Sequence, residues 1–269
     1  MKAIVITTPG GPEVLKLQEV EGPQIKDDEV LIKVEATALN RADTLQRKGS
    51  YPPPKGASPY PGLECSGTVV SVGKHVSRWK VGDQVCALLS GGGYAEKVAV
   101  PAGQILPVPP GVSLKDAAAF PEVACTVWST VFMTSHLSSG ETFLVHGGSS
   151  GIEDFVARVK EETGGKGVNV ILDCVGAPYF QQNLDSLDFD GRLFIIGTQG
   201  GAKTELNIGS LFARRLTVQA AGLRSRSLEN KAEIVSEVEK YVWPAITAGE
   251  NGDWGNGGNG RGGRTSILH

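Results

Sequence analysis

A glycine- and serine-rich segment directly follows a short apolar run in the middle of the chain. Residues 142–152 read TFLVHGGSSGI. The apolar run, Phe143–Val145, fits a buried strand of a parallel sheet or the middle of a buried helix. The small residues that follow are Gly147, Gly148, Ser149, Ser150 and Gly151. A strand that ends in such a turn, before a helix with unpaired N–H groups, can bind a pyrophosphate, although a plain surface loop is the alternative.

The third glycine of a dinucleotide-binding fingerprint is missing from this segment. Ile152 leads directly into Glu153 and Asp154, where a small residue is expected. The motif alone is therefore a weak signal for a nucleotide site.

The composition excludes several classes of protein. Hydrophobic residues make up 40% and charged residues 20% of the 269 residues, as in globular proteins. The net charge of −3 gives no basic surface for nucleic acid, and no apolar run approaches the ~20 residues that span a bilayer. The cysteines are scattered without metal-site or disulfide spacing: Cys65, Cys86, Cys125 and Cys174. We expect buried thiols in a reducing cytoplasm, with no metal, nucleic acid or membrane as partner.

The first 120 residues read as short strands separated by glycine and proline. The clearest is Glu29–Ala36, where Val30, Ile32 and Val34 share one face. Such a series predicts a partly open antiparallel barrel. Two loops interrupt it: residues 38–49 are compatible with a helix, and residues 61–67 place Glu64 between apolar neighbours. A buried Glu64 would need a partner, which Arg41 or a backbone amide could supply.

Several ungapped motifs of this region occur in a specific order. They are GGPEVLKL, EVLIKVEATALNRADTLQRKG, YPGLECSGTV, WKVGDQVCALL and GGYAEKVAVP. This order resembles the zinc-free quinone oxidoreductases of the medium-chain dehydrogenase/reductase superfamily, in the p53-inducible and zeta-crystallin-related branch. The resemblance covers residues 1–248. It implies an α/β protein with a GroES-like domain over residues 1–120 and an NADPH-binding Rossmann domain over residues 121–248. Zinc-dependent relatives carry histidine where Leu63 stands, so the resemblance implies no metal.

The resemblance also implies catalytic residues. It places Asn40 and Tyr51 in the substrate cleft near the nicotinamide. The phenol of Tyr51 could donate a hydrogen bond to a quinone carbonyl and stabilise negative charge that develops there. The alternatives are that Tyr51 packs on the neighbouring prolines and that Asn40 caps a helix.

Cofactor contacts are implied at nine positions. They are Thr126, Gly147, Gly148, Ser149, Ser150, Gly151, Gly176, Gly197 and Arg224. Core packing is the alternative for Thr126, and a solvated basic turn is the alternative for Arg224. His146, at the end of the apolar run, is either a base or the partner in a structural hydrogen bond.

The segment after Ile152 departs from the family pattern. Residues 153–163 predict an amphipathic helix and residues 167–174 a buried strand. By itself this is one βαβ unit, with Asp173 where a ribose-binding acid belongs. The family has a further strand, helix and strand between Ile152 and Glu153, about 45 residues in all. The resemblance therefore implies a truncated, doubly wound parallel sheet that lacks the group binding the 2′-phosphate.

Weaker signals complete the chain. Ser113 predicts the cap of a short helix ended by Pro121, and residues 126–133 predict the next helix. Asp190 and Gly191 predict a turn before a strand at 192–197. Residues 249–269, rich in glycine and asparagine, predict a disordered tail.

Together these features predict an NADPH-dependent quinone or enone oxidoreductase that works by hydride transfer. The resemblance implies a cytoplasmic homodimer, and the truncation predicts impaired activity. The alternative is a catalytically inactive product in which residues 1–130 fold as a barrel and act as an interaction module or a dimer partner.

Overall fold

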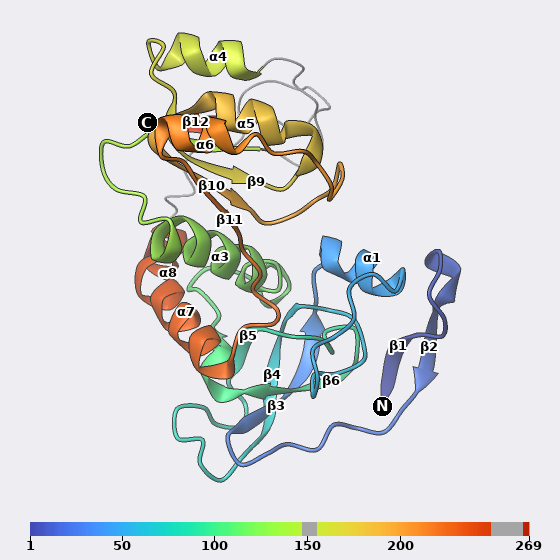
Figure 1. The fold of residues 1–269 in the computed structure, drawn as a ribbon. Helices are drawn as coiled ribbons and strands as arrows, with labels where there is room; N and C mark the ends of the chain where they lie inside the picture. Colours follow the sequence, from blue (N-terminus) through green and yellow to red (C-terminus); the bar gives the residue numbers. More distant parts are fainter. Residues whose placement is uncertain (147–154, 249–265, 269) are drawn as a thin grey trace. The chain divides into compact units, whose positions relative to one another are not determined.

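The computed structural model describes residues 1–146, 155–248 and 266–268 (Figure 1). The predicted turn at residues 147–151 and most of the predicted tail lie outside these residues. The chain forms two compact units: Met1–Trp128 with Leu223–Trp254, and Ser129–Gly222 with Gly255–His269. Compact units and family domains are different divisions of a chain, so the domain boundaries expected from the sequence stay a prediction.

The first unit is built on an antiparallel sheet with the strand order β6-β3-β4-β5-β7. A separate hairpin, β1 with β2, bonds to it through the bridge between Ala3 and Ala95. The strands are β1 (Lys2–Ile6), β2 (Leu15–Glu19), β3 (Glu29–Ala36), β4 (Glu64–Val72), β5 (Gln84–Leu88), β6 (Lys97–Pro101) and β7 (Ile105–Pro107). The antiparallel sheet expected for a GroES-like fold is confirmed.

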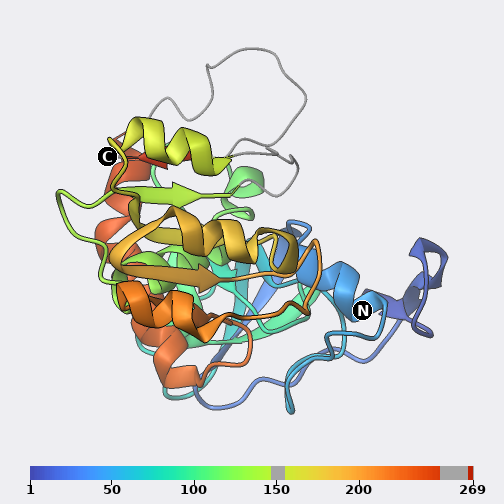
Figure 2. The same cartoon turned by 45° about the horizontal axis from the view of Figure 1, so that its top comes forward.

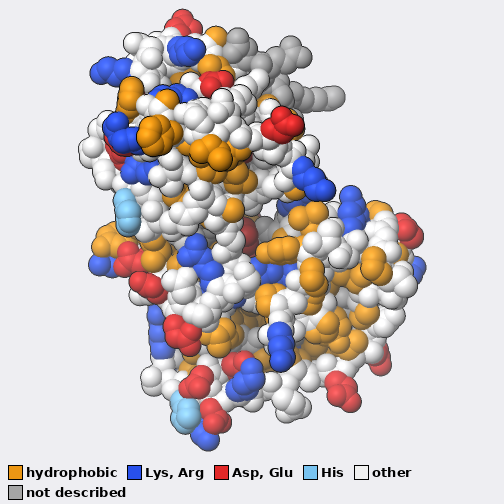
Figure 3. Space-filling model, viewed as in Figure 1, with side chains coloured by type: hydrophobic (Ala, Val, Ile, Leu, Met, Phe, Trp, Pro, Cys, Tyr) orange, Lys and Arg blue, Asp and Glu red, His pale blue; other side chains and the backbone are white. Residues whose placement is uncertain are grey.

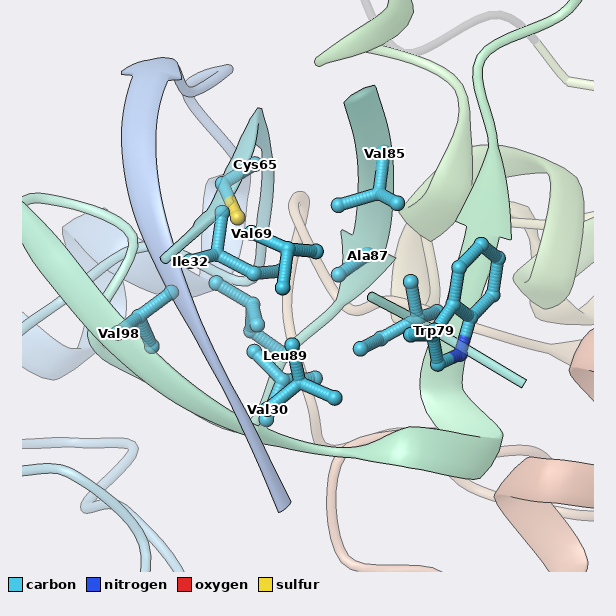
Figure 4. Packing of buried hydrophobic residues seen from close by; sticks show 11 residues of the cluster. Val30, Ile32, Cys65, Val69, Trp79, Val85, Ala87, Leu89 and Val98 are labelled. Carbon is cyan, nitrogen blue, oxygen red and sulfur yellow. The ribbon is translucent and has the colours of Figure 1, made fainter. Parts of the chain in front are cut away.

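Alternating side chains of these strands form the core of the first unit (Figure 4). Val30 and Ile32 of β3 are fully buried, as their alternation predicts, and they pack with Val69 of β4 and Val85 of β5. Burial of each such side chain contributes about 1.5–3 kcal/mol.

The first unit contains helices from before residue 129 and from after residue 222 of the sequence. They are η1 (Pro12–Val14), α1 (Arg41–Arg47), η2 (Ala102–Gln104), α2 (Leu114–Ala117), α3 (Pro121–Val127), α7 (Leu228–Tyr241) and α8 (Trp243–Thr247). Ser113 caps α2 as predicted, because its side chain accepts the N–H of Asp116. The prediction that Pro121 ends a helix is wrong: α2 ends at Ala117, and Pro121 begins α3, where its missing N–H costs no hydrogen bond.

The second unit holds a sheet with the order β11-β10-β9-β8-β12. The strands are β8 (Phe143–Val145), β9 (Val168–Asp173), β10 (Leu187–Ile195), β11 (Thr217–Ala220) and β12 (Ser266–Leu268). The four strands β8 to β11 are parallel, which confirms the Rossmann-type sheet. Phe143–Val145 is thus a strand, and it pairs directly with β9. On its other edge β8 pairs with β12, which is antiparallel.

Three helices cover one face of this sheet (Figures 1 and 2). They are α4 (Phe155–Glu162), α5 (Phe180–Ser186) and α6 (Ile208–Arg214), and the short helix η4 (Ala177–Tyr179) precedes α5. Phe155 of α4 and Leu184 of α5 pack with Leu144 of β8 and Ile171 of β9 in one buried cluster. A π-helix, η3 (Trp128–Thr134), occupies the segment where the sequence predicts a regular apolar helix.

The turn predicted at Asp190 and Gly191 lies inside β10 instead. Asp190 has a left-handed backbone (φ 58°), and the pairing of β10 with β9 changes register between Leu187 and Arg192. The prediction of a turn between α5 and a strand starting at 192 is therefore wrong. The turn-forming residues produce an irregularity within a longer strand.

Candidate active site

Asn40 lies at the start of α1 and contacts a buried carboxylate. It is the N-cap residue of α1, and its backbone N–H donates to Asp43 Oδ2 at 2.8 Å. Its side-chain Nδ2 also donates to Glu64 Oε1 at 2.9 Å. The helix-cap interpretation of Asn40 is therefore correct, and the same side chain reaches across to β4.

Glu64 has two partners, as a buried carboxylate requires. The second one is the backbone N–H of Glu122, at the first turn of α3, which donates to Glu64 Oε2 at 2.9 Å. A backbone amide and Asn40, not Arg41, thus satisfy Glu64, which is 3% exposed. Burial raises the pKa of Glu64, although both hydrogen bonds oppose this shift.

Glu122 connects Glu64 with a predicted cofactor residue. The hydroxyl of Thr126, one helical turn further on in α3, donates to Glu122 Oε1 at 3.1 Å. Burial, and then the nearby carboxyl of Glu64, raise the pKa of Glu122 to about 7. A hydrogen-bonded series therefore runs from Asn40 through Glu64 and Glu122 to Thr126, and we call it the carboxyl chain.

A third carboxylate, Asp43, holds the loop before β4. Asp43 Oδ1 accepts the N–H of Gly62 at 2.8 Å, and Asp43 Oδ2 accepts the hydroxyl of Tyr94 at 3.2 Å. Gly62 has φ +103°, and a Cβ there would lie 2.5 Å from the Cα of Gly93. Only glycine lets these two backbones meet, and their contact sets the position from which Glu64 enters the core.

The structure brings Tyr51 and Arg224 together. The guanidinium of Arg224 lies 5.2 Å from the ring centroid of Tyr51, and Nη1 donates to the backbone oxygen of Tyr51 at 3.3 Å. Nε donates to the carbonyl of Ser90 at 2.9 Å, and Nη2 to Gln46 Oε1 at 2.6 Å. Arg224 is 4% exposed, so the solvated basic turn considered for it is wrong.

Lys231 of α7 bonds to the same two loops, at Ser90 and at Arg224. Its Nζ donates to the hydroxyl of Ser90 and to the carbonyl of Arg224, and it is buried. Burial, and then the charge of Arg224, lower the pKa of Lys231. Arg224 and Lys231 thus fix the position of Tyr51 relative to α1 and to the loop after β5.

In the second unit, Gly176 and Gly197 lie in loops at the carboxyl ends of β9 and β10. Gly176 has φ +83°, and a Cβ there would lie 2.6 Å from the oxygen of Gly201. A Cβ on Gly197 would lie 3.0 Å from the oxygen of Cys174. These glycines allow the two loops to pack backbone against backbone, at the edge where doubly wound sheets bind ligands. The contact of Gly176 and Gly197 with a nicotinamide stays a prediction.

Asp173 does not present its carboxylate as a ribose-binding acid would. It is fully buried, and it accepts the N–H groups of Val175 at 2.7 Å and Gly176 at 3.1 Å. It therefore shapes the loop that contains Gly176. The position of Asp173 in the sequence suggested a ligand contact, and the structure gives it a role in the turn.

His146 makes a structural hydrogen bond at the end of β8. Its Nε2 lies 2.6 Å from Asn183 Oδ1, and its ring contacts those of Phe155 and Tyr179 edge-on. Burial lowers its pKa, so the neutral imidazole predominates at pH 7. The five residues from Gly147 to Gly151 that follow it lie outside the described residues.

The cysteines and the remaining polar groups offer no metal cluster within the part of the chain that the structure describes. Cys65, Cys86 and Cys125 are buried free thiols, and Cys174 is partly buried. Burial raises the pKa of Cys86 to about 12. Leu63, which stands in place of a zinc-binding histidine, is buried. No described helix is long and apolar enough to cross a membrane.

Sequence reasoning missed Glu122, Gln46, Ser90 and Lys231. Glu122 alone carried a usable signal, because it is the only charged residue in the stretch from residue 117 to residue 134. Lone charges in apolar helices need buried partners. The other three became recognisable only when residues more than a hundred positions apart met in the fold.

Comparison with known proteins matches both parts of the chain. The family described as "Alcohol dehydrogenase GroES-like domain" matches residues 26–110, and that described as "Zinc-binding dehydrogenase" matches residues 137–239. The quinone oxidoreductase of Mus musculus is 30% identical over 275 residues, covering 85% of this chain and 82% of the relative. That of Sus scrofa is 28% identical over 283 residues, covering 89% of this chain and 85% of the relative.

Solved structures show the same likeness. The Escherichia coli quinone oxidoreductase complexed with NADPH has a TM-score of 0.78 and 27% identity, covering 93% of this chain and 89% of its own. A mycobacterial protein complexed with NADPH has a TM-score of 0.80 and 28% identity, covering 92% and 89%. The chain therefore belongs to the zeta-crystallin-like quinone oxidoreductases of the medium-chain dehydrogenase/reductase superfamily.

Proposed function

We propose that this chain reduces quinones or conjugated enones with NADPH, and that it binds NADPH more weakly than complete relatives do. Membership of the quinone oxidoreductase family supports the reaction, and two solved relatives carry NADPH. The bound cofactor supplies the hydride. The chain supplies orientation and hydrogen bonds for charge that develops on the substrate oxygen.

Asn40 and Tyr51 are the proposed catalytic residues. An asparagine amide has two N–H donors, and Glu64 accepts one of those on Asn40 Nδ2. The carboxylate polarises this amide, whose second hydrogen can donate to a quinone oxygen. Arg224 holds Tyr51 through the backbone oxygen and the ring of Tyr51, and neither contact uses the hydroxyl that is proposed to donate to substrate.

The proposed cofactor residues are Thr126, Gly147 to Gly151, Gly176, Gly197 and Arg224. Arg224 uses three of its five N–H donors on protein oxygens, and its guanidinium lies beside the ring of Tyr51, the proposed substrate residue. Gly176 and Gly197 support a contact with the nicotinamide end, because their loops present backbone at the carboxyl edge of the sheet.

The proposal of weakened NADPH binding rests on which strand pairs with the outer edge of β8. A doubly wound dinucleotide sheet has a second parallel strand at this position, and that strand begins the half that holds the adenosine. Here β8 pairs instead with the short antiparallel β12 from the end of the chain. The alignment with the Sus scrofa enzyme supports a loss of sequence. It runs over 283 residues, more than the 269 of this chain, although only 89% of the chain takes part.

Fluorescence titration with NADPH and with NADH tests this proposal. We expect dissociation constants above the micromolar range and no preference between the two, since the group for the 2′-phosphate is lost. Micromolar binding of NADPH with clear discrimination against NADH would contradict weakened binding.

Quinone reduction at saturating cofactor tests the activity itself. Tyr51→Phe keeps the ring and the backbone acceptor for Arg224, so a fall in kcat of about 10- to 100-fold isolates the hydroxyl.

We also propose a homodimer formed through the edge strand β11. Close to that edge, large apolar side chains of α6 reach the surface: Ile208 is 72% and Phe212 87% exposed. Figure 3 shows hydrophobic side chains gathered over α6. A second copy that adds its own β11 would pair the open backbone edge and cover these side chains.

The cytoplasmic location stays a prediction, and the free cysteines fit a reducing compartment.

A further inference from the structure

The carboxyl chain links two residues that are proposed to contact substrate and cofactor. Asn40 lies at one end and Thr126 at the other, and Glu64 and Glu122 lie between them. Each link is a hydrogen bond of 2.9 to 3.1 Å, and all four residues belong to the first unit. The two glutamates come from β4 and α3, so the fold itself holds them together.

Double ionisation of Glu64 and Glu122 is disfavoured, because the backbone N–H of Glu122 bonds to the carboxylate of the buried Glu64 and each charge acts on the other. Loss of hydration penalises each charge, and each charge penalises the other. Burial and Glu64 raise the pKa of Glu122 to about 7, and burial raises that of Glu64. Glu64 accepts two hydrogen bonds, from an amide side chain and a backbone N–H, which stabilise its charged form. Glu122 is therefore the member of the pair that keeps the proton.

Among the residues that the structure describes, the groups around Glu122 add no positive charge that would ionise it. Asp43 of α1 repels it further. The thiols of Cys86 and Cys125 stay neutral, because burial raises the pKa of both. On α7, which packs against α3, Lys231 is bonded to Ser90 and to the carbonyl of Arg224, and Glu239 is bonded to Arg78.

Reduction of a quinone by hydride leaves an anionic hydroquinone oxygen that needs a proton. We propose that Glu122 stores this proton and delivers it to the substrate oxygen through the hydroxyl of Thr126. This inference rests on the proposed function, and it assigns an acid that neither the family match nor the sequence identified.

The step balances as follows. The quinone gains two electrons and one proton as hydride, and one of its oxygens becomes anionic. Thr126 gives its hydroxyl proton to that oxygen while its own oxygen takes the proton of Glu122. Glu122 is left as a carboxylate, with its Oε1 3.1 Å from the hydroxyl oxygen of Thr126. Solvent then returns one proton to Glu122.

Infrared difference spectroscopy of the protein without substrate tests whether Glu122 holds a proton. We expect a protonated carboxyl band that disappears as the pH rises through about 7 and that is absent from Glu122→Gln. Glu35→Gln, an exposed residue of β3, is the control and should keep the band. If no carboxyl band titrates near neutral pH in the wild type, the proposal is overturned.

The pH dependence of quinone reduction tests the delivery. We expect kcat to fall as Glu122 ionises above about pH 7, and Glu122→Gln to lower kcat about 100-fold and remove this dependence. Thr126→Val should give the same loss, and Thr126→Ser should restore activity. A titrating band with a pH profile that Glu122→Gln leaves unchanged overturns the delivery. If the wild type reduces no quinone, the proposed function fails and the delivery fails with it, while the infrared band still decides whether Glu122 holds the proton.

Discussion

The backbone of Gly176 lies so close to Gly201 that a Cβ on Gly176 would meet the oxygen of Gly201 at 2.6 Å. The two residues also form a parallel bridge, and the N–H of Ala177 donates to the same oxygen at 2.9 Å. This contact joins the loops after β9 and β10 at the edge of the sheet where the cofactor is proposed to bind.

Gly176→Ala should therefore destabilise the second unit strongly. Gly165 provides a control for positive φ, because its φ is +85° and no described atom lies within 4 Å of its Cβ position, whereas Gly176 combines φ +83° with ψ −131° and a close contact. We expect Gly165→Ala to lower the free energy of unfolding by about 1 kcal/mol through backbone strain alone, and Gly176→Ala by about 3 kcal/mol or more. Urea unfolding measures both. Equal losses for the two variants would show that neither the close contact nor the ψ of Gly176 adds to the cost.

Glu122 should make stability depend on pH in an unusual direction. Its pKa is raised from 4.5 to about 7 in the folded protein, so the folded state holds a proton that the unfolded state releases. The stability that this provides is complete below about pH 4.5 and is lost as the pH rises through about 7. We expect the free energy of unfolding of the wild type to fall by about 3 kcal/mol across this window relative to Glu122→Gln. Denaturant unfolding at several pH values checks this, and parallel curves for the two proteins would refute it.

Arg224→Met should loosen the loop that carries Tyr51. The substitution leaves the oxygens of Ser90, Tyr51 and Gln46 without their donor in a buried place. We expect a loss of about 3 kcal/mol in the free energy of unfolding. Arg158→Met is the control, since Arg158 is exposed and forms only a surface ion pair with Glu162, worth less than about 1 kcal/mol. Similar losses for both would mean that the buried hydrogen bonds of Arg224 add nothing.

Phe212→Asp should separate the proposed dimer without unfolding the chain. Phe212 is 87% exposed, so a charge there meets water in the monomer and an apolar partner surface in the dimer. We expect sedimentation to show dimers for the wild type and monomers for Phe212→Asp. Leu17→Asp, at a 64% exposed position on β2, should remain dimeric. A wild type that is already monomeric would refute the dimer.

The sequence predicted the regular elements well where the pattern was strong. Strand β3 has the predicted bounds, because its alternation of apolar and polar residues extends over its whole length. The proline and turn signals marked changes in backbone direction correctly, but they did not predict which element contains each change. Pro121 starts a helix where an end was predicted, and Asp190 turns the backbone inside a strand.

The contacts within the candidate site were harder to predict from the sequence than the strands and helices. The buried position of Glu64 was suggested by its apolar neighbours, yet its backbone partner lies 58 residues away. The partners of Arg224 are up to 178 residues distant. No local pattern encodes such pairings, since they depend on how whole elements pack. The roles of Asn40, Tyr51, Thr126, Gly176, Gly197 and Arg224 stay predictions.

The first unit is assembled from two segments that residues Ser129–Gly222 of the second unit separate in the chain. Ile234, Val235 and Val238 of α7 are buried, and Arg224 and Lys231 complete the hydrogen bonds of Ser90. Ribosomes release a chain from its amino terminus, so the amino-terminal sheet emerges long before the helix that completes it. A nascent chain of residues 1–130 lacks that helix, and the apolar surface that it covers stays exposed until residues 228–241 have been synthesised. Chaperone demand during synthesis should therefore be highest before residue 223 appears.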